Sequence, residues 1–295
     1  MGNRDWRGFG RVNPGAEMEA RAMSFRYDQD EYVASTWTLE HRPLKDALDA
    51  FHCYGFSQVE IWADTVHLDP RVKPDIPQVK AWLRQYGMAV HSLHAPFRNY
   101  HDRPADEMEF CRARTRLLKQ TCDYAQALGC PILVVHAVDR KEYNYPMAQL
   151  GVVTDYIGET VRYAAQRGVR VAIEDIPPGG DPSEIYTTLE NQKRLFADLD
   201  IDFCLDIGHV PLLGADVYRE VDAAGGRLIT LHIHNNCGKS DDHNLPGDGV
   251  LNWPVLHDYI RKSGYQGQFV LEIYGGEGPE AETKALEGIG RLFDR

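Results

Sequence analysis

The sequence predicts a single α/β domain in which eight parallel strands, each followed by a helix, close into a (β/α)8 TIM barrel. Apolar runs of strand length alternate with amphipathic helical runs along the 295-residue chain. Strands that are apolar throughout and separated by helices pair in parallel. Eight such units over roughly 270 residues fit a closed barrel. An open doubly wound sheet would carry a Gly-rich phosphate loop after an early strand, and no G-x-G-x-x-G motif follows one here.

The strands are identified as short apolar runs, most of which end in His, Asp or Glu. All are too short to cross a bilayer, so no membrane association is predicted. In chain order we expect them at Tyr32–Trp37, Gln58–Ala63, Met88–His94, Pro131–Ala137, Arg170–Asp175, Asp202–Ile207, Leu228–Asn235 and Gln268–Ile273.

Helical runs lie between the strands, and several end on glycine, which is typical of a helix C-terminus. We expect helices over residues 43–55, Glu107–Gly129 and Val152–Gly168, and a last helix from about Pro279 to Phe293. The barrel domain is therefore expected over residues 31–295. A loosely ordered polar tail is expected over residues 1–30, and Met23 is an alternative start.

Composition restricts the class of protein. Lys and Arg total 32 against 44 Asp and Glu, a net charge of −12. Because a protein that grips a phosphate backbone usually has a basic face, this acidity disfavours a nucleic-acid partner without excluding it. The six cysteines form no C-x-x-C pair, and the N-terminal segment lacks the apolar run of a secretory signal. These features predict a cytoplasmic protein, and they leave open whether it is a homo-oligomer.

Nine potential metal ligands stand at or just after strand ends, or in the loop after the seventh strand. In a (β/α)8 barrel the carboxyl ends of all strands open on one face, so these residues are expected to be neighbours in space. Imidazoles and carboxylates are the ligands that divalent ions such as Zn²⁺ and Mn²⁺ prefer. The nine are His94, His136, Glu174, Asp206, His209, His232, Asp241, His243 and Glu272.

Four of these residues are expected to hold one divalent ion, which would be Mn²⁺, Zn²⁺, Co²⁺ or Mg²⁺. Glu174 and Asp206 follow apolar runs, and a lone buried carboxylate is costly unless it is paired or metal-bound. Glu272 repeats this pattern on the last strand. His232 and His234 are two residues apart on a strand, so both can face the interior, and only one is needed. The expected ligands are Glu174, Asp206, His232 and Glu272, with His234 as the alternative to His232.

Further residues are expected to bind a second metal or the substrate. Taken alone, a histidine at a strand end is also explained as a hydrogen-bonded core residue, and an Asp or His in the loop is better explained as exposed to solvent. The glycine in D-I-G-H is expected to let the chain turn sharply and bring the His209 imidazole back to the strand end. The LPGDG turn is expected to close the preceding loop over the barrel mouth. The group is His94, His136, His209, His234, Asp241 and His243.

Substrate contacts are expected at the same rim. Trp62 and Phe97 follow the second and third strands and are candidates for an apolar wall against a sugar face, although ordinary packing explains them equally well. Glu60, in VEIW, is expected to orient Trp62 or the substrate. His209 is expected to contact a substrate oxygen if it does not bind a second metal.

The ordered set of motifs resembles the xylose-isomerase-like barrel superfamily. The motifs are HAPF, VVHA, IED, LDIGH, HIHNN followed by D-x-H and PGDG, and the final LEIY, and the resemblance runs from about Tyr32 to Phe293. The superfamily contains sugar isomerases and epimerases together with endonuclease-IV-type abasic-site nucleases. In the epimerases the matching residues Glu174, Asp206, His232 or His234, and Glu272 would hold one ion, and the two Glu would move protons. In the nucleases all nine ligands would match a three-zinc cluster.

The chain departs from both groups. The nucleases continue after the equivalent of Glu174 with an Asn and a small-residue turn, where this chain has DIPPGG. Ketose 3-epimerases carry an Arg shortly after the strand-seven His, where the nearest basic residue here is Lys239.

The resemblance implies a metal-dependent isomerase or epimerase that acts on a small sugar-like hydroxy-carbonyl compound by enediolate proton transfer, with Glu174 and Glu272 as catalytic acid and base. A nuclease-type phosphodiesterase, a lyase or dehydratase acting on the same metal-bound enolate, and a non-enzymatic binding barrel remain alternatives.

Overall fold

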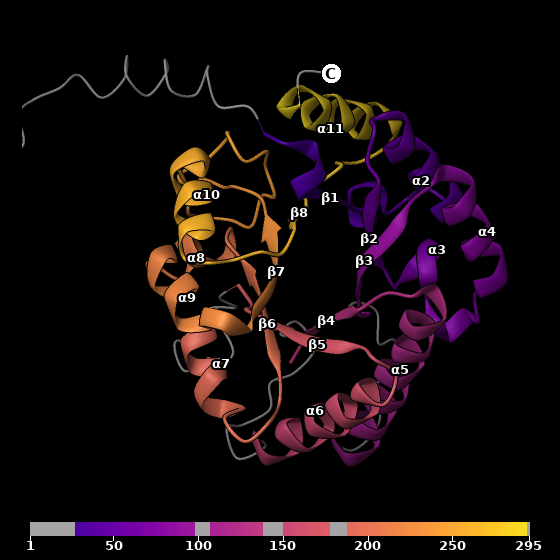
Figure 1. Ribbon diagram of the computed structural model, residues 1–295, viewed down its shortest axis with the longest axis vertical. Helices are drawn as coiled ribbons and strands as arrows, with labels where there is room; N and C mark the ends of the chain where they lie inside the picture. Colours follow the sequence, from indigo (N-terminus) through magenta and orange to yellow (C-terminus); the bar gives the residue numbers. More distant parts are fainter. Residues whose placement is uncertain (1–26, 98–106, 138–149, 178–187, 294–295) are drawn as a thin grey trace, which may run out of the picture.

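Eight parallel strands form a closed barrel in chain order, and helices surround it (Figure 1). The computed structural model describes residues 27–97, 107–137, 150–177 and 188–293. The predicted (β/α)8 architecture is confirmed. The strands are β1 (Tyr32–Ser35), β2 (Gln58–Trp62), β3 (Ala89–His94), β4 (Ile132–His136), β5 (Arg170–Glu174), β6 (Asp202–Asp206), β7 (Leu228–Ile233) and β8 (Phe269–Leu271).

The expected strands match the observed ones to within two residues at each end. The largest differences lie at the carboxyl ends of β1, β7 and β8, which stop two residues early. After β1 the chain enters a 3-10 helix, η2 (Thr36–Leu39), where the Ser35 hydroxyl accepts a hydrogen bond from the Trp37 backbone N–H at 3.4 Å. An apolar run alone does not reveal such a change of backbone, because the buried residues continue through it.

The helices follow the expected alternation. α2 (Leu44–Cys53), α5 (Glu107–Leu128), α6 (Leu150–Ala165) and α11 (Pro279–Leu292) correspond to the four helices delimited from the sequence. Gly55, Gly129 and Gly168 have φ values of 83°, 74° and 69°, the left-handed conformation that ends a helix. The other helices are α3 (Thr65–Leu68), α4 (Ile76–Tyr86), α7 (Leu189–Leu195), α8 (His209–Leu212), α9 (Val217–Ala224) and α10 (Trp253–Lys262), with short 3-10 turns η1 (Gln29–Glu31), η3 (Pro70–Val72) and η5 (Gly225–Arg227).

The apolar core has two parts, as the barrel geometry requires. One large cluster packs the outward faces of the strands against the helices. A small inner cluster inside the barrel contains Ile132, Val134, Ala172 and Cys204. Because side chains two residues apart share a face of a strand, the next inward positions on β4, β5 and β6 are His136, Glu174 and Asp206. The barrel interior is therefore apolar in its lower part and carries ligand-type side chains at its carboxyl end.

The N-terminal tail is only partly within the described residues. Residues 1–26, including Met23, lie outside them. From Tyr27 the chain is described, and the Tyr27 ring packs edge-on against Tyr32 at a centroid distance of 5.6 Å. No helix within the described ranges is long and apolar enough to cross a membrane.

Candidate metal and active site

Strand register brings the expected ligands to one level of the barrel. The Cα partner of His136 on β4 is Glu174 on β5, and the partner of Asp206 on β6 is His232 on β7. These residues are the last or nearly the last of their strands, and their side chains point inward. The end of each apolar run therefore delivers a ligand-type side chain to the same small volume.

Four of these side chains form a compact group, which we call the strand cluster. It consists of Glu174, Asp206, His232 and Glu272, all buried, and each offers a ligand atom within 4.8 Å of those of the others. Nδ1 of His232 lies 3.1 Å from Oε1 of Glu174 and 3.2 Å from Oε2 of Glu272. The four residues that the sequence assigns to the first metal thus meet in space.

Two histidines from neighbouring strands contact the other oxygen of Glu174. Nε2 of His94 lies 3.0 Å from Oε2 of Glu174, and Nε2 of His136 lies 3.1 Å from the same atom. The His94 and His136 rings are 5.0 Å apart, nearly perpendicular. Glu174 is therefore shared between these two imidazoles and the strand cluster.

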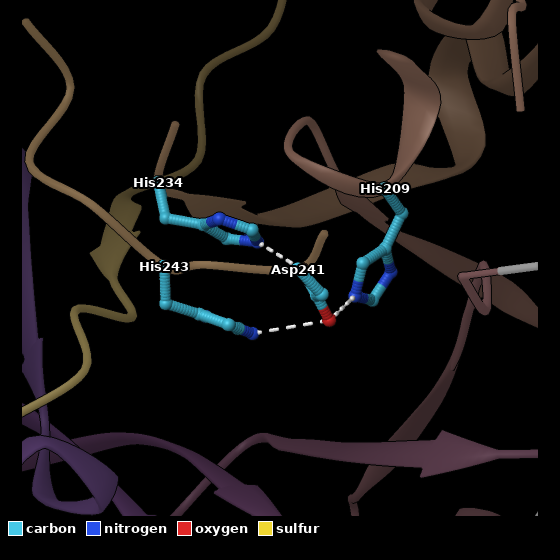
Figure 2. A group of neighbouring side chains, drawn as sticks. All are labelled: His209, His234, Asp241 and His243. Carbon is cyan, nitrogen blue, oxygen red and sulfur yellow. Dashed lines mark ion pairs between the residues drawn. The ribbon is translucent and has the colours of Figure 1, made fainter. Parts of the chain in front are cut away.

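A second group, the loop cluster, lies beside the first and is drawn in Figure 2. It consists of His209 from α8, His234 just after β7, and Asp241 and His243 from the following loop. Oδ2 of Asp241 lies 3.4 Å from Nε2 of His209 and 3.3 Å from Nε2 of His243. The imidazoles of His234 and His243 are stacked at 3.7 Å. All four belong to the residues expected to bind a second metal or the substrate.

Asp206 joins the two clusters. Its Oδ1 lies 2.7 Å from Nε2 of His234, and its Oδ2 lies 3.5 Å from Nε2 of His209. Both histidines of the HIH motif face the barrel interior, as expected, but they face different groups. His232 points to Glu174 and Glu272, whereas His234 points to Asp206 and Asp241.

The contacts around Asp206 fit a bound cation better than a closed hydrogen-bond network. Both ring nitrogens of His234 and Oδ2 of Asp206 are buried without a hydrogen-bond partner among the described residues. Buried polar atoms are rarely left in this state. Imidazole nitrogens and carboxylate oxygens that approach closely without hydrogen-bond geometry are the donor set that a divalent ion accepts. The residues present therefore fit a divalent metal ion.

Charge compensation inside the clusters keeps the carboxylates ionised. Burial opposes ionisation of Asp206, but the imidazoles of His209 and His234 outweigh it and lower its pKa to about 2. Burial also opposes ionisation of Glu174, yet His232 and His136 hold its pKa well below the usual range. For His243, burial is outweighed by Asp241, which raises the pKa of the imidazole to about 9. A cation bound here would replace the imidazole protons, so binding would release protons.

Asn235 fixes the loop that carries Asp241 and His243. Its backbone forms a two-way bridge with Asn244, at 2.9 and 2.8 Å. Its side-chain amide donates to the carbonyl oxygens of Pro246 and Leu251, both at 2.9 Å. The loop is therefore held by a residue just after β7, and the LPGDG turn is one of the segments that Asn235 contacts. The Asn pair at the end of HIHNN was the available sequence signal for this role.

The glycine of the D-I-G-H motif has a different role from the one expected. Gly208 has φ −75° and ψ −25°, which any residue adopts, so the turn toward His209 does not require glycine. A Cβ atom at this position would lie 2.0 Å from the His234 ring. Glycine is thus required because the His234 imidazole packs directly against the backbone.

Two buried residues that were not singled out from the sequence, Asp175 and Gln192, form hydrogen bonds with the backbone or ring atoms of the candidate ligands. Oδ1 of Asp175 accepts a hydrogen bond from the Asp206 backbone N–H at 2.7 Å, and the Asp175 carbonyl oxygen lies 2.9 Å from Nδ1 of His209. An imidazole fixed at one nitrogen presents the other in a defined direction. Gln192 donates to the Glu174 carbonyl oxygen at 2.7 Å. The sequence signal for the role of Asp175 was its place as the second acidic residue of the IED motif.

Aromatic side chains line the mouth around both clusters. Phe97, half-buried, lies 4.9 Å from the His94 ring and 4.7 Å from the His136 ring. Trp62 is 1% exposed and packs 5.8 Å from Phe97. Trp37, on η2 after β1, lies 4.6 Å from the His243 ring. The sequence analysis gave Trp37 as the last residue of the first strand and assigned it no role, whereas it lies in the 3-10 helix η2 after β1.

Comparisons with known proteins agree with this architecture. The chain is 24% identical over 258 residues to a putative hydroxypyruvate isomerase of Streptomyces coelicolor, covering 82% of this chain and 89% of that protein. It is 24% identical over 265 residues to fructoselysine 3-epimerase of Escherichia coli O157:H7, covering 85% and 94%. Its fold matches a crystal structure of an AP endonuclease of family 2 from Brucella melitensis, with a TM-score of 0.70 and 18% identity over 86% of this chain and 96% of that chain. The sequence pattern of the xylose isomerase-like TIM barrel family matches residues 48–294, and the chain therefore belongs to this family.

Proposed function

We propose that the protein is a divalent-metal-dependent isomerase or epimerase acting on a small sugar or related hydroxy-carbonyl compound. The observation that carries this proposal is the placement of two glutamates from strands that are not neighbours. Glu174 on β5 and Glu272 just after β8 both come within 3.2 Å of one nitrogen of His232. The names of two relatives, a putative hydroxypyruvate isomerase and a fructoselysine 3-epimerase, support the same class of reaction.

The two glutamates are suited to moving a proton between neighbouring carbons of a substrate by way of an enediolate. A divalent ion held by Glu174, Asp206, His232 and Glu272 would act as a Lewis acid toward the substrate oxygens. One glutamate would remove the proton and the other would return one to the adjacent carbon or the opposite face. Burial opposes ionisation of Glu272, but His232 outweighs it and lowers the pKa of this carboxyl, so the group is present as a base.

The substrate would enter from the mouth of the barrel, where the aromatic residues lie. Phe97 would offer an apolar face to a sugar ring or chain, supported from behind by Trp62. Tyr274, whose ring is 5.8 Å from Trp37 and 40% exposed, would close the opposite side. His209 remains a candidate for a substrate oxygen, because its Nε2 lies where the two clusters meet, 3.5 Å from Asp206 and 3.4 Å from Asp241.

A panel of ketoses and hydroxypyruvate in D₂O tests this proposal. With Mn²⁺ or Zn²⁺ supplied, we expect a member of the panel to be converted into an isomer or epimer that carries deuterium at the reacting carbon. Chelation of the metal should stop the reaction. Loss of water or cleavage of the carbon chain would indicate a lyase or dehydratase instead, and no turnover of any hydroxy-carbonyl compound would contradict the proposed class.

A metal-dependent phosphodiesterase of the abasic-site nuclease type is the second candidate. The loop cluster favours it, since its residues offer ligands for an ion in addition to the one that the strand cluster would hold. The AP endonuclease with a similar fold is named for that activity. The net charge of −12 opposes it, because grip on a phosphate backbone depends on Lys and Arg.

Duplex DNA is expected not to bind with useful affinity. The measurement is fluorescence anisotropy with a labelled duplex that contains an abasic-site analogue, at about 0.15 M salt, where weak phosphate contacts are partly screened. An undamaged duplex of the same sequence is the control. Saturable sub-micromolar binding of the abasic duplex, or its cleavage, would favour the phosphodiesterase over the isomerase.

A further inference from the structure

Glu60 is a fully buried glutamate on β2 that lies on the far side of His232 from the other glutamates. Its Oε2 is 3.2 Å from Nε2 of His232, a residue 172 positions later in the chain. Both side chains are 0% exposed. His232 is therefore contacted by carboxylates at both ring nitrogens, with Glu60 at Nε2 and Glu174 and Glu272 at Nδ1.

Two serines on the adjacent strands hold Glu60 in this position. Ser92 on β3, its Cα partner in the sheet, donates a hydrogen bond to Oε2 of Glu60 at 2.7 Å. Ser35 on β1 donates to Oε1 at 3.4 Å. Both serines are buried as well. A carboxylate held by two hydroxyl groups and an imidazole has little freedom to rotate, and its burial leaves no surface for a substrate.

An imidazole that meets a carboxylate at one nitrogen presents its other nitrogen in a fixed direction, and such partners set both the tautomer and the ring plane of histidine ligands. Here the fixed nitrogen is Nε2, so Nδ1 is the atom directed at Glu174 and Glu272. If the ring rotated or flipped, both short contacts at Nδ1 would be lost together.

We infer that Glu60 is a positioning residue that acts through His232 to set the placement of the Glu174 and Glu272 carboxylates and the affinity of the strand cluster for its metal. This role differs from the substrate contact expected from VEIW. The inference rests on the proposed function only where it concerns the effect of Glu60 on turnover. Its effects on metal affinity and on the His232 ring do not depend on which substrate the protein converts.

The test is Glu60→Gln, which keeps the size of the side chain and one acceptor oxygen for a serine hydroxyl, but replaces the other oxygen by an NH₂ group and removes the negative charge. We expect metal affinity, measured by chelator competition, to fall by roughly 10- to 100-fold, as is typical when such an orienting partner is lost. Turnover should fall while KM changes little, because Glu60 does not reach the substrate. In metal-free protein labelled with ¹⁵N-histidine, the His232 ring signals, assigned by their absence in His232→Gln, should shift.

Glu220→Gln is the matched control, because Glu220 is a buried glutamate on α9 whose carboxylate accepts a hydrogen bond from the Leu189 backbone N–H. It should leave metal affinity and the His232 signals unchanged.

If Glu60→Gln does not fold, Ser92→Ala provides the test. This variant removes one hydrogen-bond donor to Glu60, so metal affinity and the His232 signals should change in the same direction but by less. Unchanged metal affinity and unchanged His232 signals in Glu60→Gln, or in Ser92→Ala if that variant is needed, would overturn the inference. So would a rise in KM alone. Failure to convert any hydroxy-carbonyl compound would contradict the proposed function but leave both of these readouts valid.

Discussion

Replacing either Glu174 or Glu272 by Gln is expected to reduce turnover by a factor on the order of 10² or more, the size of a typical general acid–base contribution. The amide keeps an oxygen that can face a metal and fills the same space. It cannot accept a proton from a carbon acid, so proton removal or return fails. Both variants should retain part of their bound metal and a native far-UV circular dichroism spectrum.

The two variants should not be equivalent in detail. Glu174 contacts His94, His136 and His232, whereas the Glu272 side chain contacts His232 and lies 3.9 Å from Nδ1 of His243. Glu174→Gln should therefore weaken metal binding more than Glu272→Gln does. The measurement is kcat and KM for the substrate found in the ketose panel, with Glu220→Gln as the control. Full activity in either variant would remove that glutamate from the mechanism and shift the role of base to His209.

The sequence was sufficient to predict the barrel and the identity of the clustered residues. Each apolar run from β3 to β7 ends close to a histidine or a carboxylate, and a parallel barrel brings such ends together whatever the details of the loops. Glu174 and Asp206 could be placed inside the barrel because a buried carboxylate needs a partner. These arguments use only local pattern and a general property of the fold.

The contacts that separate the two clusters and place Glu60 were not predicted, and they join residues far apart in the sequence. Nothing local distinguishes His232 from His234, and their separation between two clusters depends on which carboxylates face them from other strands. Glu60 was noticed, but its partner is a residue on a strand that is not adjacent to β2. Gly208 was explained by chain reversal, whereas the requirement for glycine comes from the His234 ring. Periodicity within one element carries no information about such contacts.

Asp206→Ala is expected to abolish tight metal binding. Asp206 belongs to the strand cluster and is also the residue through which the loop cluster contacts it. Its loss removes one ligand outright and leaves Asp241 as the carboxylate that faces His234 and His209. A substitution of this size at the open end of a strand should leave the barrel folded, because the apolar layers below do not depend on it. Asp202→Ala is the matched control, since Asp202 lies at the other end of β6 and pairs with Arg170.

Metal content per chain in the wild type, Asp206→Ala and Asp202→Ala, measured on the purified proteins by mass spectrometry after exhaustive dialysis, tests the central claim most directly. The wild type and Asp202→Ala should each retain one tightly bound divalent ion, with any second ion in the loop cluster lost on dialysis. Asp206→Ala should retain none. An unchanged metal content in Asp206→Ala would contradict the assignment of the strand cluster as the metal site, and three tightly bound ions in the wild type would contradict the isomerase and support the phosphodiesterase.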